Sequence, residues 1–135
     1  ANNFAVRADA IGGDRDDVMQ GFLNAWAKSG YAGLVDIDVT RAMAMEADPE
    51  NWINEELGTI FLTAAQGLHR PDAEIFGDLR TDVWAGVIAE MAAVGMIAGE
   101  VAPDGLLNRA YVDNANQFDR AEIEAEVAAW KAANM

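Results

Sequence analysis

Few side chains in this sequence belong to the types that perform catalysis, and those few stand apart. His69 is the only histidine, Ser29 is the only serine, and the chain contains no cysteine. A nucleophilic serine needs a base within hydrogen-bonding reach, and no Gly-x-Ser-x-Gly turn surrounds Ser29. A single histidine without cysteine makes no standard zinc site. We therefore interpret His69 as a surface residue, and we expect no catalytic residue and no enzyme activity.

The acidic residues are the other candidates for chemistry. They form three groups: Asp14 with Asp16 and Asp17, Asp36 with Asp38, and Glu122 with Glu126. The aspartate groups could ligate a hard cation, but neither matches the calcium loop, which needs a Gly at its sixth position and a distal Glu. The glutamates share one helix face, where a buried pair could act as acid and base. Their surroundings, "RAEIEAEVAAW", are typical of a solvated face. We predict helix caps and exposed carboxylates, with no metal site and no cofactor.

The charge balance excludes some partners. The chain carries 23 acidic and only 9 basic residues, a net charge of −14. Phosphate backbones and anionic membrane surfaces are both bound through Lys and Arg, so we expect neither nucleic acid nor a membrane surface as a partner. A solvated acidic surface is the simplest interpretation, and a nucleic-acid mimic or a cation site is the sharper one. No window of about 20 apolar residues lacks charge, so we expect no membrane insertion.

The apolar spacing predicts a mainly α chain of five to six helices with one or two short strands. At 135 residues the chain is one domain or part of one. We expect a strand segment at 1–13, a helical body at 14–118 and a C-terminal helix at 119–135. The predicted elements are a strand at Phe4–Arg7, helices near 15–33, 39–43, 49–68 and 81–94, a short turn near 104–108, and the last helix. The strongest period is that of Ile53, Leu57, Ile60, Phe61, Ala64 and Leu68.

Short polar residues predict where these helices begin. The expected caps are Asp14 with Asp17, Asp36 or Asp38, Asp48 before Pro49, Thr81, and Asp119 with Glu122. The end of the fourth helix is predicted from Gly95. As a left-handed residue it would complete a Schellman motif, with Met96 in apolar contact with Met91 and Pro103 preventing continuation of the helix.

Read together, residues 3–118 resemble the C-terminal portion of ABC-transporter substrate-binding proteins. The branch is that for nitrate, sulfonate and taurine, and for thiamine pyrimidine precursors. The resemblance is carried by "NNFAVRADAIGGDRDDVMQGFLNAWAKSGYAGLVD", by "DIDVTRAMAMEADPENWINEELGTIFL" and most of all by "DVWAGVIAEMAAVGMIAGEVAPDGLLNRAYVDNAN". In that last block Trp84, Gly95-Met96-Ile97, Pro103-Asp104 and Asn114 stand in register.

The resemblance implies a solute-binding component of an importer, outside the cytoplasm, with a small-molecule ligand and a permease as partners. It implies part of a lobe of the type II periplasmic-binding-protein fold, in which Phe4–Arg7 pairs with a sheet and residues 1–4 lie nearest the hinge between lobes. A family member has about twice this length and a signal peptide or a lipoprotein Cys. The chain is therefore either a fragment of such a protein or a short relative that has lost ligand binding, and we expect the fragment because an isolated return strand would leave an unpaired edge. The resemblance identifies no individual ligand-binding residue here. The alternative is a stand-alone acidic helical protein that forms homodimers through its apolar faces.

Overall fold

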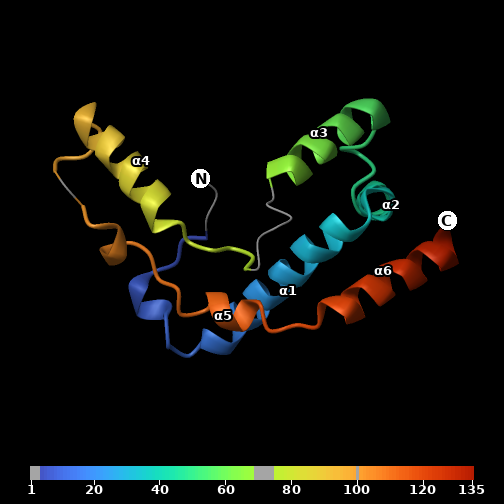
Figure 1. Ribbon diagram of the computed structural model, residues 1–135, viewed down its shortest axis with the longest axis horizontal. Coiled ribbons are helices and arrows are strands. Elements are labelled where there is room, and N and C mark those ends of the chain that lie inside the picture. The colour runs from blue at the N-terminus through green and yellow to red at the C-terminus, as the bar shows by residue number, and fades with distance from the viewer. Residues whose placement is uncertain (1–3, 69–74, 100) are drawn as a thin grey trace.

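The computed structural model describes residues 4–68, 75–99 and 101–135, and over these ranges the chain is mainly α-helical, as predicted. Figure 1 shows the helices spread around α1, with α3 and α4 diverging as two arms. The helices of the described residues are α1 (Asp16–Val35), α2 (Ile37–Ala47), α3 (Glu55–Leu68), α4 (Thr81–Ala93), α5 (Val112–Ala115) and α6 (Arg120–Asn134), with 3-10 turns η1 (Ala8–Ala10) and η2 (Pro103–Gly105).

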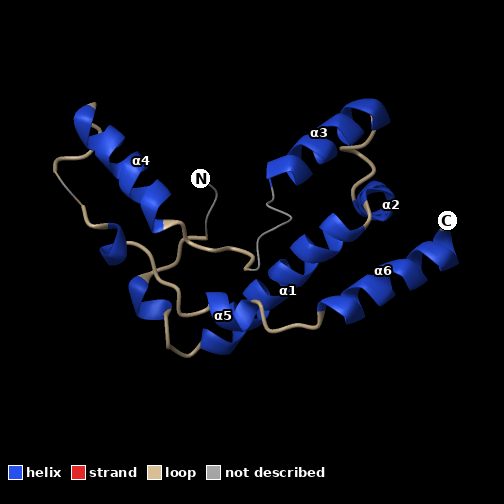
Figure 2. Cartoon of the chain, in the orientation of Figure 1, coloured by secondary structure: helices blue, strands red, loops and turns tan. Residues whose placement is uncertain are grey.

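The predicted strand at Phe4–Arg7 is wrong. These residues form no strand, and Figure 2 draws only helices and loops over the described parts of the chain. A strand needs a partner for its ladder, and no other described segment offers one. Phe4 instead packs against the side of α1, where its ring meets Phe22 and Trp26 edge-on, with centroids 5.2 Å away in each case. Residues 1–3, expected near a hinge, lie outside the described residues.

The core is small and centres on α1. Ala27 is fully buried against Phe76 and Ala115, and partly buried apolar residues from α1 and from the last part of the chain pack around these three. α5 and α6 both pack against α1 (Figure 1), so an early helix and the last two helices of the chain meet in this core. Gly30 makes the contact close, since a Cβ there would lie 3.3 Å from the Phe76 ring. The glycine at position 30 thus leaves room for the Phe76 ring, and α1 continues past it to Val35.

Two of the predicted caps are confirmed. Asp36 caps α2, and its Oδ1 accepts the backbone N–H groups of Asp38 at 3.0 Å and Val39 at 3.2 Å. Asp119 caps α6 by accepting from the N–H groups of Ala121 and Glu122. Both acidic residues also stand at the end of a helix where the macrodipole favours negative charge.

Three predicted caps are wrong. α1 begins after Arg15 without a side-chain cap, so Asp14 does not cap it. Thr81 is the first residue of α4 rather than its cap. Asp48 ends α2, because Asp48 and Pro49 form turns of their own to the N–H groups of Asn51 and Trp52. These turns delay the next helix, which begins at Glu55.

The cap of α3 and the end of α4 come from short local patterns. Asn54 caps α3, since its Oδ1 accepts the N–H of Leu57 at 3.0 Å. At the end of α4 the backbone hydrogen bonds of the predicted Schellman motif are confirmed, whereas the predicted apolar contact between Met96 and Met91 stays a prediction. Gly95 has φ of 75°, the Met96 N–H donates to Met91 O at 2.8 Å, and the Gly95 N–H donates to Ala92 O at 3.0 Å. The following chain returns along α4, where η2 packs against it.

The chain exposes far more surface than a compact protein of its mass. Its accessible area is 9622 Å², whereas a folded monomer of 14.5 kDa is expected to expose about 6,900 Å². The excess is about 2,700 Å². The described residues that are buried are Ala27, Val39, Phe76, Ile88 and Ala115, and two of these five are alanines. Eighteen large apolar side chains of the described residues are nevertheless exposed.

Candidate functional site

The densest polar contacts of the described residues lie where the start of α1 meets α5. Asp16 accepts three hydrogen bonds there: from the Gly12 N–H at 2.8 Å, from Gln20 Nε2 at 2.6 Å, and from the hydroxyl of Tyr111. Asn114 Nδ2 donates to Gln20 Oε1 at 2.7 Å and extends the set. We call Gly12, Asp16, Gln20, Tyr111 and Asn114 the Asp16 cluster.

The Asp16 cluster holds a fixed charge. The Tyr111 hydroxyl, followed by Gln20 and the Gly12 N–H, lowers the pKa of Asp16, and the hydrogen bond to Asp16 in turn raises the pKa of Tyr111. Around neutral pH Asp16 is therefore ionised and Tyr111 protonated. A carboxylate held by three donors and a phenol held by a carboxylate are poorly suited to exchange protons with a substrate. The cluster joins α1 to α5 rather than forming an acid–base site.

Asn116 makes a second connection beside the core. Its Nδ2 donates to Phe76 O at 3.0 Å and to Val112 O at 2.7 Å, and its Oδ1 accepts the Phe76 N–H at 2.7 Å. One amide thereby satisfies both backbone groups of Phe76. Close by, Asn24 Nδ2 donates to Ala115 O at 3.1 Å. These amides fix the segment that carries Phe76 against α5.

α6 is held by charged and aromatic contacts. Lys131 Nζ lies 2.6 Å from Asp36 Oδ2, and this pairing is the main cause of a lowered pKa at Asp36. The Tyr31 hydroxyl donates to Glu124. The Arg120 guanidinium stands 5.0 Å from the centroid of the Tyr31 ring. Asp36, a metal candidate in the sequence, thus caps one helix and anchors another.

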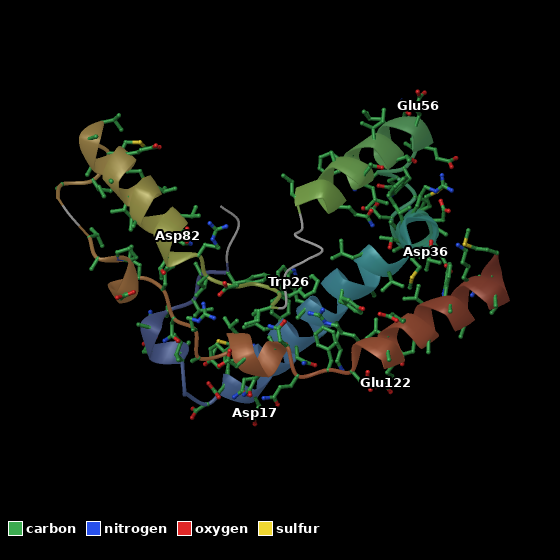
Figure 3. The ribbon with its side chains drawn as sticks, viewed as in Figure 1. Asp17, Trp26, Asp36, Glu56, Asp82 and Glu122 are labelled. Atoms are coloured by element: carbon green, nitrogen blue, oxygen red, sulfur yellow. The ribbon has the colours of Figure 1, made fainter. Side chains whose placement is uncertain are left out.

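The acidic groups predicted from the sequence do not come together as a metal site. In the described ranges no group of three or more His, Cys, Asp or Glu side chains could hold an ion. Asp38 pairs with Arg41 at 3.4 Å, while Asp14 and Asp17 are exposed. Figure 3 shows the labelled acidic side chains spread over separate elements. On α6, Glu122 and Glu126 are both exposed, as expected for a solvated face.

The remaining candidates offer no reactive arrangement. Ser29 is exposed on α1, and His69 lies outside the described residues. An open hollow of about 440 Å³ lies between α2 and α3, lined by Arg41, Glu55, Glu56, Thr59 and Ile60. The Arg41 guanidinium lies 3.8 Å from Glu55 as well as facing Asp38, so the cation of the hollow is already engaged. The hollow is too open to enclose a small ligand.

Comparison with protein-family models, curated proteins and solved structures found no match to this chain. None of the helices in the described ranges combines the length and apolar character needed to cross a membrane.

The Asp16 cluster predicts acid sensitivity. A carboxyl whose pKa is lowered by folding contributes stability above its unfolded pKa and loses it as pH falls through the folded value, hence below about pH 4 for an aspartate. Tyr111→Phe removes the largest cause of the shift at Asp16. We expect the variant to melt at a lower temperature than the parent at pH 7, and the gap to narrow toward pH 3. Melting curves followed by circular dichroism across this range would measure it. A difference in melting temperature that is independent of pH would contradict the conclusion that Tyr111 stabilises the fold through the ionised Asp16.

Proposed function

We propose that this chain is the C-terminal helical part of the solute-binding component of an ABC importer, and that it has no catalytic activity. The order of the helices supports the proposal: a long first helix, a short helix capped by Asp36, a longer third helix, and a Trp-containing helix ended at Gly95. The turn at Pro103 and the polar segment around Asn114 follow in the order of the block that carries the resemblance.

The single observation that carries the proposal is the excess surface. About 2,700 Å² beyond the expectation for a compact monomer is several times the roughly 800 Å² that each partner contributes to a standard protein–protein interface. Such an area is typical of a chain that folds against an extensive second body. The missing first part of a two-lobed receptor is a body of that kind, and on this proposal it supplies most of the ligand pocket.

The remaining features of the proposal follow from the receptor class. The ligand is a small nutrient of the nitrate, sulfonate, taurine or thiamine-pyrimidine type, and the second partner is a membrane permease. The place of action is the periplasm or another compartment outside the cytoplasm. The fixed charge of Asp16 and the exposed position of Ser29 agree with a protein that binds without reacting.

The test uses the product of the complete gene. Its melting temperature would be measured with nitrate, taurine, an alkanesulfonate and a pyrimidine precursor of thiamine, each at millimolar concentration. A cognate ligand at about 100 times its Kd stabilises a protein by about 2.7 kcal/mol, which would appear as a shift of several degrees. The 135-residue chain, measured beside it, should show no shift. An open reading frame confined to these 135 residues, or a complete product that none of the ligands stabilises, would refute the proposal.

A further inference from the structure

We propose that α6 is a strap that detaches from α1 and α2 as a unit, before the core around Ala27 unfolds. Figure 1 shows α6 beside α1, with the C-terminal end of α6 near α2. Residues 116–119 join the strap to α5. Detachment uncovers the side of α1 that carries Tyr31, so the strap controls access to that side whether or not the chain belongs to a receptor.

Polar contacts at two places hold the strap against the rest of the chain. In its first half Glu124 accepts a hydrogen bond from the Tyr31 hydroxyl of α1, and near its end Lys131 Nζ lies 2.6 Å from Asp36 Oδ2. Glu124 and Lys131 are about two helical turns apart and therefore lie on the same face of α6. The Lys131 and Asp36 side chains remain 44% and 24% exposed, so water and salt reach this pair. An ion pair of this kind holds a helix only weakly.

Apolar packing holds the strap less firmly than it holds the core. No residue of α6 is buried. The large apolar side chains on its inner face are only half-buried, and they are Ile123, Val127 and Trp130. The buried residues of the core, Ala27, Phe76 and Ala115, all lie outside α6. Asn116, which binds the backbone of Phe76, also lies before the strap, so these contacts remain when α6 leaves.

Detachment leaves the helix caps on both sides intact. Asp36 caps α2 through Oδ1 and binds Lys131 through Oδ2, so α2 keeps its cap when Lys131 leaves. At the start of α6 the cap is Asp119, and at its end Asn134 Nδ2 donates to Trp130 O at 2.8 Å. A free helix of 15 residues is only marginally stable in water, so its backbone amides exchange with solvent once α6 is detached.

The first experiment is hydrogen–deuterium exchange of the 135-residue chain at pH 7, followed by mass spectrometry. The amides of residues 121–134 should exchange about tenfold faster than those of residues 23–31 in α1, because the strap opens while the core stays closed. Lys131→Gln should speed exchange in the strap by about threefold and leave α1 unchanged. Lys28→Gln is the matched control, since it makes the same change at an exposed lysine of α1, and it should leave both segments unchanged. Equal exchange rates in the strap and the core, or equal effects of the two substitutions, would overturn the proposal.

The second experiment separates the role of Asp36 as a cap from its contact with the strap. Asp36→Asn keeps a side-chain oxygen that can cap α2, but it removes the charge that faces Lys131. Asp36→Asn should therefore speed exchange in the strap as much as Lys131→Gln does, while exchange in α2 stays as in the parent. The double variant should exchange no faster than either single variant, because both substitutions remove one interaction. Additive effects would show that Asp36 and Lys131 act independently, and the pair would then not hold the strap.

Discussion

Replacing Asn116 with aspartate is expected to remove a large part of the stability of this fold. The carboxylate loses the two N–H donors that now reach Phe76 O and Val112 O, and it places a negative charge against both carbonyl oxygens. Each partly buried polar group left unsatisfied costs about 1–3 kcal/mol, so we expect the free energy of unfolding to fall by about 3–5 kcal/mol. Native domains are stable by only about 5–15 kcal/mol. Urea denaturation followed by tryptophan fluorescence would measure the change.

Two variants control for this result. Asn116→Ala removes the same hydrogen bonds without adding charge. Its free energy of unfolding should lie between that of the parent and that of Asn116→Asp. Asn108→Asp makes the same chemical change at an exposed site, where Oδ1 accepts the Ala110 N–H and a carboxylate can do the same. It should be close to neutral. If Asn116→Asp were as stable as Asn108→Asp, the amide would not hold Phe76 in place.

Ala27→Asp should have a similarly large effect on the core. Ala27 is fully buried and packs against Phe76 and Ala115. A carboxylate at this position would be desolvated among apolar side chains or forced to take up a proton. We expect a loss of more than about 4 kcal/mol, at the upper end of what single substitutions cause. The near-ultraviolet dichroism of the packed aromatic rings should disappear.

Ala25→Asp is the matched control for this prediction. It introduces the same side chain two positions away on α1, at an exposed residue. Its cost should not exceed the difference in helix propensity, about 0.7 kcal/mol. A comparable loss in both variants would mean that α1 is destabilised as a helix rather than detached from its core.

The helices themselves could be predicted because their signals are local. The stripe of Leu57, Ile60 and Phe61 marks α3, and Asp36 and Asp119 cap helices by contacts within three residues. The same reasoning failed at Asp48, where an adjacent proline made a turn that competes with the helix start. It also failed at Phe4–Arg7, because an alternating pattern forms a strand only where a second strand is present to pair with.

The polar connections could not have been predicted from the sequence. Tyr111 is 95 residues from Asp16, and Asn116 is 40 residues from Phe76. Nothing in the neighbourhood of either residue indicates which distant group it will meet. The short helix α5, which Tyr111 and Asn116 flank, has too few residues to show an apolar period. Periodicity also tells which side chains share a face of a helix but not what covers that face. Leu57, Ile60 and Phe61 of α3 illustrate this, because they share a face and are all exposed.

The pairing of α1 with α5 and α6 has a consequence for the order of events during synthesis. Ala27 leaves the ribosome about 90 residues before Ala115, which at about 5–20 residues per second is an interval of roughly 5–20 s. Over that interval α1 lacks α5 and α6 and has only the contacts with Phe4, α2 and Phe76, which earlier parts of the chain supply, so its core is incomplete. A ribosome stalled before residue 112 would therefore present α1 without the two helices that complete its packing.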